Sequence, residues 1–189
     1  MARQRITSYL EELKAVLDRF PVEDIERVVD VLLDARRTAA TVFILGNGGS
    51  AATASHFACD LGKSAISPGV PRFRVVALTD NVPLLTAWGN DTDYVNVFSE
   101  QLRNLVRPGD VVIAISGSGN SPNVLKAVEV GRQAGATTIG LTGFEGGKLK
   151  DLVDICIVVP ANHMGQAEDG HMILDHLITD CIKEASSEQ

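Results

Sequence analysis

The stretch that decides the fold is Thr41-Val42-Phe43-Ile44-Leu45-Gly46-Asn47-Gly48-Gly49-Ser50. Its β-branched and apolar first half predicts a buried strand, and its second half predicts a tight turn into a helix. The chain repeats this arrangement in Val111-Val112-Ile113-Ala114-Ile115-Ser116-Gly117-Ser118-Gly119-Asn120-Ser121. Both loops therefore place small residues between a strand and the beginning of a helix.

Loops of this kind suit a phosphate group. Backbone N–H groups at the beginning of a helix lie at the positive end of the helix dipole and bind anions. Neither loop contains the lysine of the GxxxxGK[ST] nucleotide-binding loop, so a single phosphate ester fits better than a triphosphate. An ordinary turn, in which Gly and Asn supply positive φ angles, is the alternative for either loop taken alone. Two serine-rich loops together favour phosphate binding.

Beyond residue 40 the hydrophobic pattern alternates between strands and helices. Strands are predicted near 41–46, 73–78, 111–116, 137–142 and 154–159, and helices near 49–62, 93–105, 121–134 and 167–185. This order predicts the α/β class, as a three-layer α/β/α sandwich around a five-stranded parallel sheet. Ligands of such sheets bind at the carboxyl ends of the strands, where both loops lie.

The first 40 residues precede the first predicted strand. Residues 3–20 and 22–39 carry apolar positions at helical spacing, with Pro21 between them. They predict an N-terminal helical hairpin (1–40) before the α/β core (41–189), within a single domain of residues 1–189. The apolar stripe of this hairpin either covers one face of the sheet or packs against a partner subunit, and the pattern leaves both open.

Composition limits the location and the partners. A net charge of −7 argues against a nucleic-acid-binding surface and against an anionic membrane surface. No apolar run approaches the roughly 18 residues of a membrane span, and the N-terminus has no signal-peptide pattern. Three widely spaced cysteines predict no disulfide framework. We therefore expect a cytoplasmic protein with no nucleic-acid and no membrane partner.

Two groups of ionisable residues are candidates for chemistry. His56 and Asp60 are four residues apart on the helix after the first loop, so they share a face. The last predicted helix carries Glu168, His171, Asp175 and His176. Near a bound phosphate, such groups can move a proton between C1 and C2 of a sugar phosphate or hold a divalent ion. The alternatives are an exposed ion pair and a solvated polar face.

These motifs resemble those of a known family. Bacterial phosphoheptose isomerases carry GNGGSAADAQHFAAEL, which the chain resembles in Gly46-Asn47-Gly48-Gly49-Ser50-Ala51-Ala52-Thr53-Ala54-Ser55-His56-Phe57-Ala58-Cys59-Asp60-Leu61. The second loop, continued by Ser121-Pro122-Asn123-Val124-Leu125-Lys126-Ala127, resembles the family's STSGNSPNVLKA. Leu141-Thr142-Gly143, Gly146-Gly147-Lys148-Leu149 and the HxxxxH of the last helix also match.

The resemblance covers essentially the whole chain and implies a flavodoxin-like SIS (sugar isomerase) domain. Members of the family are aldose–ketose isomerases of heptose biosynthesis. They convert sedoheptulose 7-phosphate to D-glycero-D-manno-heptose 7-phosphate through an enediol. They are homotetramers, with the N-terminal helices and the last helix at interfaces. The resemblance therefore implies an enzyme with a sugar-phosphate substrate.

Carried over by position, the resemblance also implies site residues. The phosphate would be held by Ser50, Ser116, Ser118 and Ser121, within a substrate-binding set that also includes Asn47, Gly48, Gly49, Asn90, Asp91, Gly117 and Glu168. The general base of the family falls on Asp60 and the general acid on His176. One Zn²⁺ per subunit would be bound by His56, Asp60, Glu168 and His176.

Four positions depart from the family pattern. Asp60 replaces a glutamate and Glu168 a glutamine, so the metal set gains a negative charge and also suits another divalent metal. Gly117 stands where the family has threonine, and Gly165 where it has an acidic residue. Two alternatives therefore stay open. One is an isomerase of a different sugar phosphate. The other is a non-catalytic SIS module that binds a sugar phosphate or a protein, like the DnaA initiator-associating protein of the same fold group.

Overall fold

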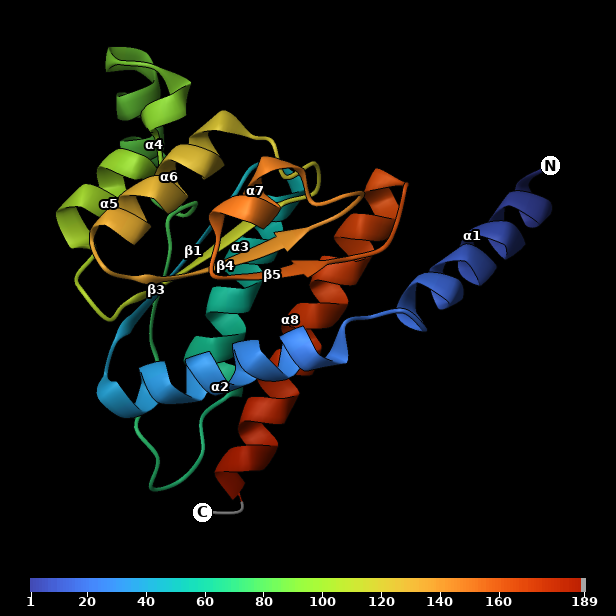
Figure 1. Ribbon diagram of the computed structural model, residues 1–189, viewed down its shortest axis with the longest axis horizontal. Coiled ribbons are helices and arrows are strands. Elements are labelled where there is room, and N and C mark those ends of the chain that lie inside the picture. Colours follow the sequence, from blue (N-terminus) through green and yellow to red (C-terminus); the bar gives the residue numbers. More distant parts are fainter. Residues whose placement is uncertain (188–189) are drawn as a thin grey trace.

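The computed structural model describes residues 1–187 as a five-stranded, all-parallel sheet with helices on both faces (Figure 1). The strand order is β2-β1-β3-β4-β5. The strands are β1 (Thr41–Gly46), β2 (Arg74–Ala77), β3 (Val111–Ser116), β4 (Thr137–Thr142) and β5 (Ile155–Val158). Each predicted strand is confirmed, with bounds that differ by at most one residue at either end. Apolar runs this continuous are typical of strands that are buried on both faces.

Two hydrophobic cores hold the layers together. On one face, α2 (Val22–Thr38), α3 (Gly49–Cys59) and α8 (Met164–Ser187) pack against alternate strand residues such as Ile44 and Ile113. On the other face, α5 (Ser99–Leu105), α6 (Pro122–Gln133) and α7 (Gly147–Leu152) pack against their neighbours, such as Phe43 and Val112. The predicted three-layer sandwich is therefore confirmed.

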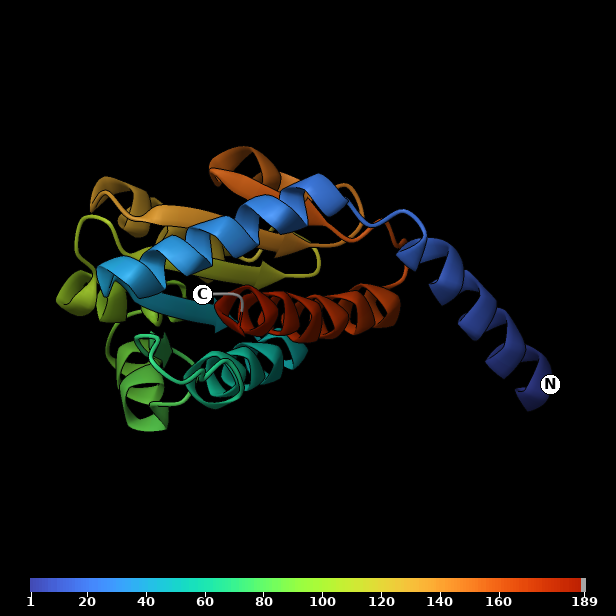
Figure 2. The same ribbon diagram turned by 90° about the horizontal axis from the view of Figure 1, so that it is seen from below.

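The two N-terminal helices are present, but they diverge. α2 lies on the sheet and buries Ile25, Val28 and Leu32, so this helix covers one face. α1 (Ala2–Leu17) instead extends away from the body of the molecule (Figures 1 and 2). Its apolar side chains Ile6 and Leu10 are 60% and 52% exposed. The first half of the α1 stripe therefore remains uncovered within one chain, whereas Val16 near the end of α1 is buried in the core.

The segment between β2 and α5 differs from the single predicted helix near 93–105. It folds as α4 (Val82–Asp91), a short 3-10 turn η2 (Tyr94–Asn96), and then α5. The Asn81 side chain accepts a hydrogen bond from the Leu84 N–H and so caps α4. The extended backbone of Asp93 separates the two helices, and its carboxylate caps η2. The Asn81 cap thus starts α4, a helix that the spacing of apolar residues in the sequence did not predict.

The end of α3 and the beginning of α8 also differ from expectation. α3 ends at Cys59 and continues as one π-helical turn, η1 (Asp60–Ser64). α8 begins three residues earlier than predicted, and the short α7 was not predicted. None of the helices in residues 1–187 is long and apolar enough to cross a membrane.

Strand order brings the two predicted loops together. In the order 2-1-3-4-5, the connections from β1 and from β3 leave in opposite directions, and ligands of such sheets bind at this switch point. β1 and β3 pair in a register that sets Gly46 opposite Ile115. The loop after β1 and the loop after β3 therefore begin side by side.

We predict that Gly119→Ala destabilises the fold more than Gly109→Ala. Both glycines have positive φ, +64° and +88°, so alanine costs about 1–2 kcal/mol of strain at either. A Cβ at Gly119 would also overlap the carbonyl of Gly146, whereas nothing lies within 4 Å at Gly109. Overpacking adds about 1–3 kcal/mol. Urea unfolding of both variants measures the difference, and equal losses would contradict the close approach of the loop after β3 to the loop before α7.

Candidate functional site

The two serine-rich loops form one end of the site. Ser116 and Ser121, from either end of the second loop, have hydroxyl oxygens 3.2 Å apart. Ser50 and Ser116 are buried, and the Ser118 hydroxyl accepts a hydrogen bond from the Asn120 N–H at 3.2 Å. Neither α3 nor α6 has a side-chain cap at its N-terminus. Two helix N-termini and four serine hydroxyl groups thus lie at this end of the site.

A reciprocal amide pair joins the two loops. The Asn47 side chain donates to the Asn123 Oδ1 at 2.8 Å, and the Asn123 side chain donates back to the Asn47 Oδ1 at 2.9 Å. The Tyr94 hydroxyl donates to the same Asn47 oxygen at 3.1 Å. Asn123 is 3% exposed and also accepts from the Val124 N–H. This pair fixes the spacing of the loops, and neither Asn123 nor Tyr94 was singled out from the sequence.

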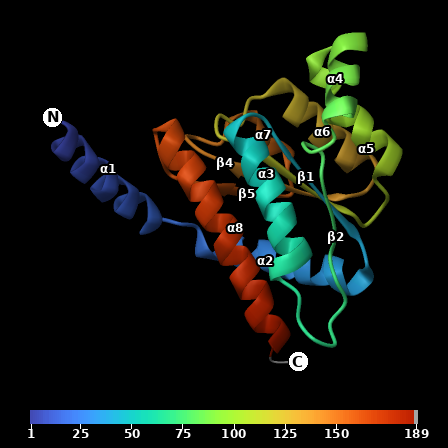
Figure 3. The same ribbon diagram turned by 180° about the vertical axis from the view of Figure 1, so that it is seen from behind.

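Helix α8 supplies the next group, Glu168. A Cβ built on Gly49 would lie 2.7 Å from the Glu168 Oε1, so this carboxylate lies against the first turn of α3. The two helices run side by side from there (Figure 3). Glu168 therefore belongs to the phosphate-loop end of the site.

A cluster of imidazoles and carboxylates lies further along the same two helices. The His56, Asp60, Asp175 and His176 side chains each offer one ligand atom, and these atoms lie within 4.8 Å of one another. The Nε2 atoms of His56 and His176 are 3.1 Å apart, and the His56 Nε2 is 3.6 Å from the Asp60 Oδ2. Three of the four predicted metal ligands are brought together here. The fourth member of the cluster is Asp175, whereas Glu168 lies at Gly49.

Asp175 is an unusual carboxylate. It is fully buried, and neither of its oxygens has a hydrogen-bond partner. Burial, aided by the negative charge of Asp60, raises the pKa of Asp175 to about 7. His171, one turn earlier, is also fully buried, and burial lowers the pKa of its imidazole. The last helix therefore turns a polar face inward, rather than out to solvent as one reading of the sequence allowed.

Two departures from the family pattern have a steric explanation. A Cβ at Gly117 would overlap the Met164 sulfur, so the methionine fills the space of a side chain at this position. A Cβ at Gly165 would lie 3.2 Å from both the Tyr9 hydroxyl oxygen and the His163 ring. Tyr9 in turn donates to Asp169 at 2.5 Å. The beginning of α8 therefore contacts the second loop through Met164, and its Gly165 lies close to Tyr9 of α1.

Asn90 and Asp91 lie at the exposed end of α4. The Asn90 amide donates to the Asp91 carboxylate at 2.8 Å. Tyr94, three residues further, reaches Asn47 of the first loop. The pair is therefore close in sequence to a residue that contacts the loops, while both side chains remain exposed.

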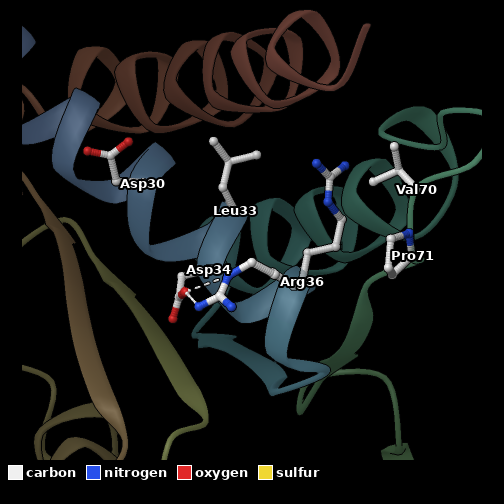
Figure 4. Close-up of a pocket in the computed structure, with 7 residues that line it drawn as sticks. Asp30, Leu33, Asp34, Arg36, Val70 and Pro71 are labelled. Carbon is white, nitrogen blue, oxygen red and sulfur yellow. Dashed lines mark hydrogen bonds and ion pairs between the residues drawn. The ribbon is translucent and has the colours of Figure 1, made fainter. Parts of the chain in front are cut away.

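A pocket of about 310 Å³ lies elsewhere, between α2 and the chain that follows η1 (Figure 4). Its lining includes Asp34, Arg36 and Pro71. The buried Arg36 guanidinium donates to Ser186 at 2.7 Å and lies over the Phe73 ring at 5.3 Å. These contacts tie α2 to the end of α8 and to the chain before β2. We assign this pocket a structural role.

Known proteins are similar to this chain in sequence and in fold. A family profile described as SIS domain matches residues 8–143. A phosphoheptose isomerase of Trichlorobacter lovleyi is 39% identical over 189 residues, covering 95% of this chain and 92% of the relative. A solved phosphoheptose isomerase of Neisseria gonorrhoeae is 33% identical, with a TM-score of 0.90 over 97% of this chain and 100% of that one. Its counterpart from Francisella tularensis also has a TM-score of 0.90, at 28% identity.

These matches show that the chain belongs to the SIS domain family and, within that family, to the phosphoheptose isomerases.

We predict that Asn123→Ala destabilises the protein by about 1–3 kcal/mol, because it leaves the half-buried Asn47 side-chain NH₂ and the buried Val124 N–H without partners. Asn104→Ala, at an exposed position of α5, is the matched control and should change stability by less than about 0.5 kcal/mol. Chemical denaturation measures both. Equal stability of the two variants would show that the amide pair does not hold the loops.

Proposed function

We propose that this protein is a metal-assisted aldose–ketose isomerase that converts sedoheptulose 7-phosphate to D-glycero-D-manno-heptose 7-phosphate. The observation that carries the proposal is the arrangement along α3. A phosphate-type loop begins this helix, and the His56 and Asp60 side chains follow at its far end. Seven residues of helix separate Gly49 from His56, or about 10 Å, which suits a sugar held by its phosphate at one end. The names of the relatives support the same reaction.

In this proposal the serines bind the phosphate. The Ser116, Ser118 and Ser121 hydroxyls from the second loop act with Ser50 at the beginning of α3. The N-termini of α3 and α6 supply backbone N–H groups and the favourable end of two helix dipoles. Asn47, Gly48, Gly49 and Gly117 line the same loops, and Asn90 and Asp91 contact the sugar from α4. The phosphate then fixes the distance of C1 and C2 from the acid–base groups.

The residues of the cluster fit a divalent ion. Two imidazoles and a carboxylate are a typical zinc donor set, and an orphaned buried carboxylate completes it. The family assignment gives this ion, one per subunit, to His56, Asp60, Glu168 and His176. A bound zinc ion would polarise the sugar carbonyl and lower the cost of the enediol.

The proton transfers fall to the chain itself. Asp60 takes the proton from C1 and returns it to C2, while His176 protonates the C2 carbonyl oxygen and then takes the proton of the C1 hydroxyl, which becomes the aldehyde. Both side chains project from facing helices, α8 and the turn that follows α3, into the same cluster. Asp60 is one methylene shorter than the glutamate of the family, so the substrate has to lie closer to this turn. A phosphate held rigidly by the two loops would keep the sugar at this shorter distance from Asp60.

The test of the proposal is an assay of the purified protein, with and without zinc, against ketose phosphates of five to seven carbons. We expect aldose formation that depends on metal and is fastest with sedoheptulose 7-phosphate. A different preferred sugar would favour the isomerase of another sugar phosphate. No turnover of any sugar by the metal-loaded protein would favour the non-catalytic binding module.

We predict that His176→Ala lowers kcat at least about 100-fold, because it removes the acid and a metal ligand together. His163→Ala is the matched control. His163 lies before α8, packs on the Tyr9 ring, and should be dispensable for turnover. Steady-state kinetics on both variants provide the measurement. An unchanged kcat in His176→Ala would remove His176 from the reaction.

We also propose that the protein is a cytoplasmic homotetramer in which α1 contacts a partner subunit. The exposed stripe of α1 supports this, because Ile6 and Leu10 are more than half exposed in one chain. Light scattering should give about four times the 20.2 kDa of the chain. The double variant Ile6→Glu, Leu10→Glu should lower this mass, because it places charge on the exposed apolar stripe. Leu105→Glu, at an exposed position of α5, is the control and should leave the mass unchanged. A wild-type monomer at micromolar concentration would overturn the assembly.

A further inference from the structure

The buried carboxylate of Asp175 has no established role. It lies on the face of α8 that packs against α3, one residue before His176 and seven after Glu168. Seven residues are close to two helical turns, so Glu168 and Asp175 share a face but lie about 10 Å apart along the axis. The two carboxylates therefore serve opposite ends of the site.

The surroundings of Asp175 favour the binding of a cation at its carboxylate. Both oxygens lack a hydrogen-bond partner, although the side chain is fully buried. A buried carboxylate without a partner is strongly destabilising unless it binds a cation or a proton. Within the cluster, the groups close to it are the Asp60 carboxylate and the imidazoles of His56 and His176. The buried His171 and Thr179 lie one turn before and one turn after it on the same face of α8. The negative charge of Asp60 repels an ionised Asp175.

Distances within the cluster match a tetrahedral metal site. Zinc ligands lie about 2.0–2.1 Å from the metal, so neighbouring ligand atoms lie about 3.3 Å apart. The His56–His176 separation of 3.1 Å and the His56–Asp60 separation of 3.6 Å lie on either side of that value. The Asp175 oxygen lies within 4.8 Å of all three ligand atoms. The four atoms thus lie close enough to one another to be ligands of one ion.

Glu168 occupies a different place. Its Oε1 and Oε2 lie 2.7 and 3.2 Å from the position of a Cβ on Gly49, in the first turn of α3. This turn precedes His56 by two helical turns. The carboxylate is thus held beside the phosphate-type loop and is not a member of the cluster of His56, Asp60, Asp175 and His176.

We propose that Asp175 is the fourth ligand of the metal ion, together with His56, Asp60 and His176, and that Glu168 is a substrate-contacting residue. The inference rests on the metal binding of the proposed function, but it changes which residue of α8 completes the donor set. Both anionic ligands then come from the buried side of the cluster, and both imidazoles come from the exposed side. The open side of the ion faces the sugar.

The experiment compares Asp175→Asn with Glu168→Gln, two variants that each replace one carboxylate on the same face of α8 with its amide. Each protein is stripped of metal, and its Zn²⁺ affinity is measured by competition with a chromogenic chelator. We expect Asp175→Asn to weaken Zn²⁺ binding at least about 10-fold, since even the loss of an outer contact costs 10–100-fold. Glu168→Gln should stay within about threefold of wild type. The visible absorption of bound Co²⁺ should lose its four-coordinate intensity in Asp175→Asn alone.

Thermal unfolding of the metal-free proteins controls for folding. Asp175→Asn should melt no lower than wild type, because a neutral amide is easier to bury beside Asp60 than a carboxylate. If the amide fails to fold, Asp175→Leu extends the neighbouring core of Leu174 and Ile178 and serves as the second variant. Unchanged Zn²⁺ affinity in either folded variant would overturn the inference, as would an equal loss in Glu168→Gln.

The metal measurement uses no sugar, so the two proposals fail separately. A wild-type protein that binds Zn²⁺ through Asp175 but isomerises no ketose phosphate contradicts the proposed function alone. A wild-type protein that isomerises a ketose phosphate, with Asp175→Asn binding Zn²⁺ normally, contradicts this inference alone.

Discussion

The parallel pairing of β1 with β3 is the constraint on which the site depends. These strands are adjacent in the sheet but far apart in sequence, and Gly46 lies opposite Ile115 at their carboxyl ends. A side chain at Gly46 would lie 2.9 Å from the Ile115 carbonyl oxygen, so only glycine lets the first loop turn this closely against β3. A slip of one residue would invert the buried faces of the strand and separate the loops. The two phosphate-type loops therefore act as one site because the sheet holds this register.

The packing of α3 against α8 then divides the site into two ends. Both helices run in the same direction, with Glu168 beside Gly49 at one end and His176 beside His56 at the other. Glu168, His56 and His176 thus project from helices, whereas the serines of the second loop lie between β3 and α6. The polar face of α8 that meets α3 contains Glu168, His171, Asp175 and Thr179, at the spacing of a helix-packing seam. Three of these residues are buried, so the interface between the helices is itself part of the site.

Much of this arrangement is readable from the sequence, for physical reasons. β-branched runs followed by small residues identify β1 and β3. Such a run favours a buried strand, and the glycine and serine that follow favour a turn. The i,i+4 spacing identifies His56 and Asp60 as neighbours. Helix α4 was missed because its start depends on a single cap at Asn81 rather than on an apolar stripe. The burial of Asp175 was also not predictable from the sequence. Periodicity assigns a residue to one face of a helix, but it does not say which other helix covers that face.

Charge balance links these features to catalysis. Asp60 and Asp175 lie on facing elements, and the negative charge of Asp60 adds to burial in raising the pKa of Asp175. In the proposed metal site the ligands come from separate elements, so ion binding would be coupled to the packing of these helices. Two carboxylates neutralise a divalent ion, so less positive charge remains to polarise a sugar carbonyl than with one carboxylate and an amide. The chain then has to supply more of the transition-state stabilisation through hydrogen bonds and proton transfer. In the proposed site, Glu168, an acid where the family has an amide, lies beside Gly49 of the phosphate-type loop and is our candidate for that contribution.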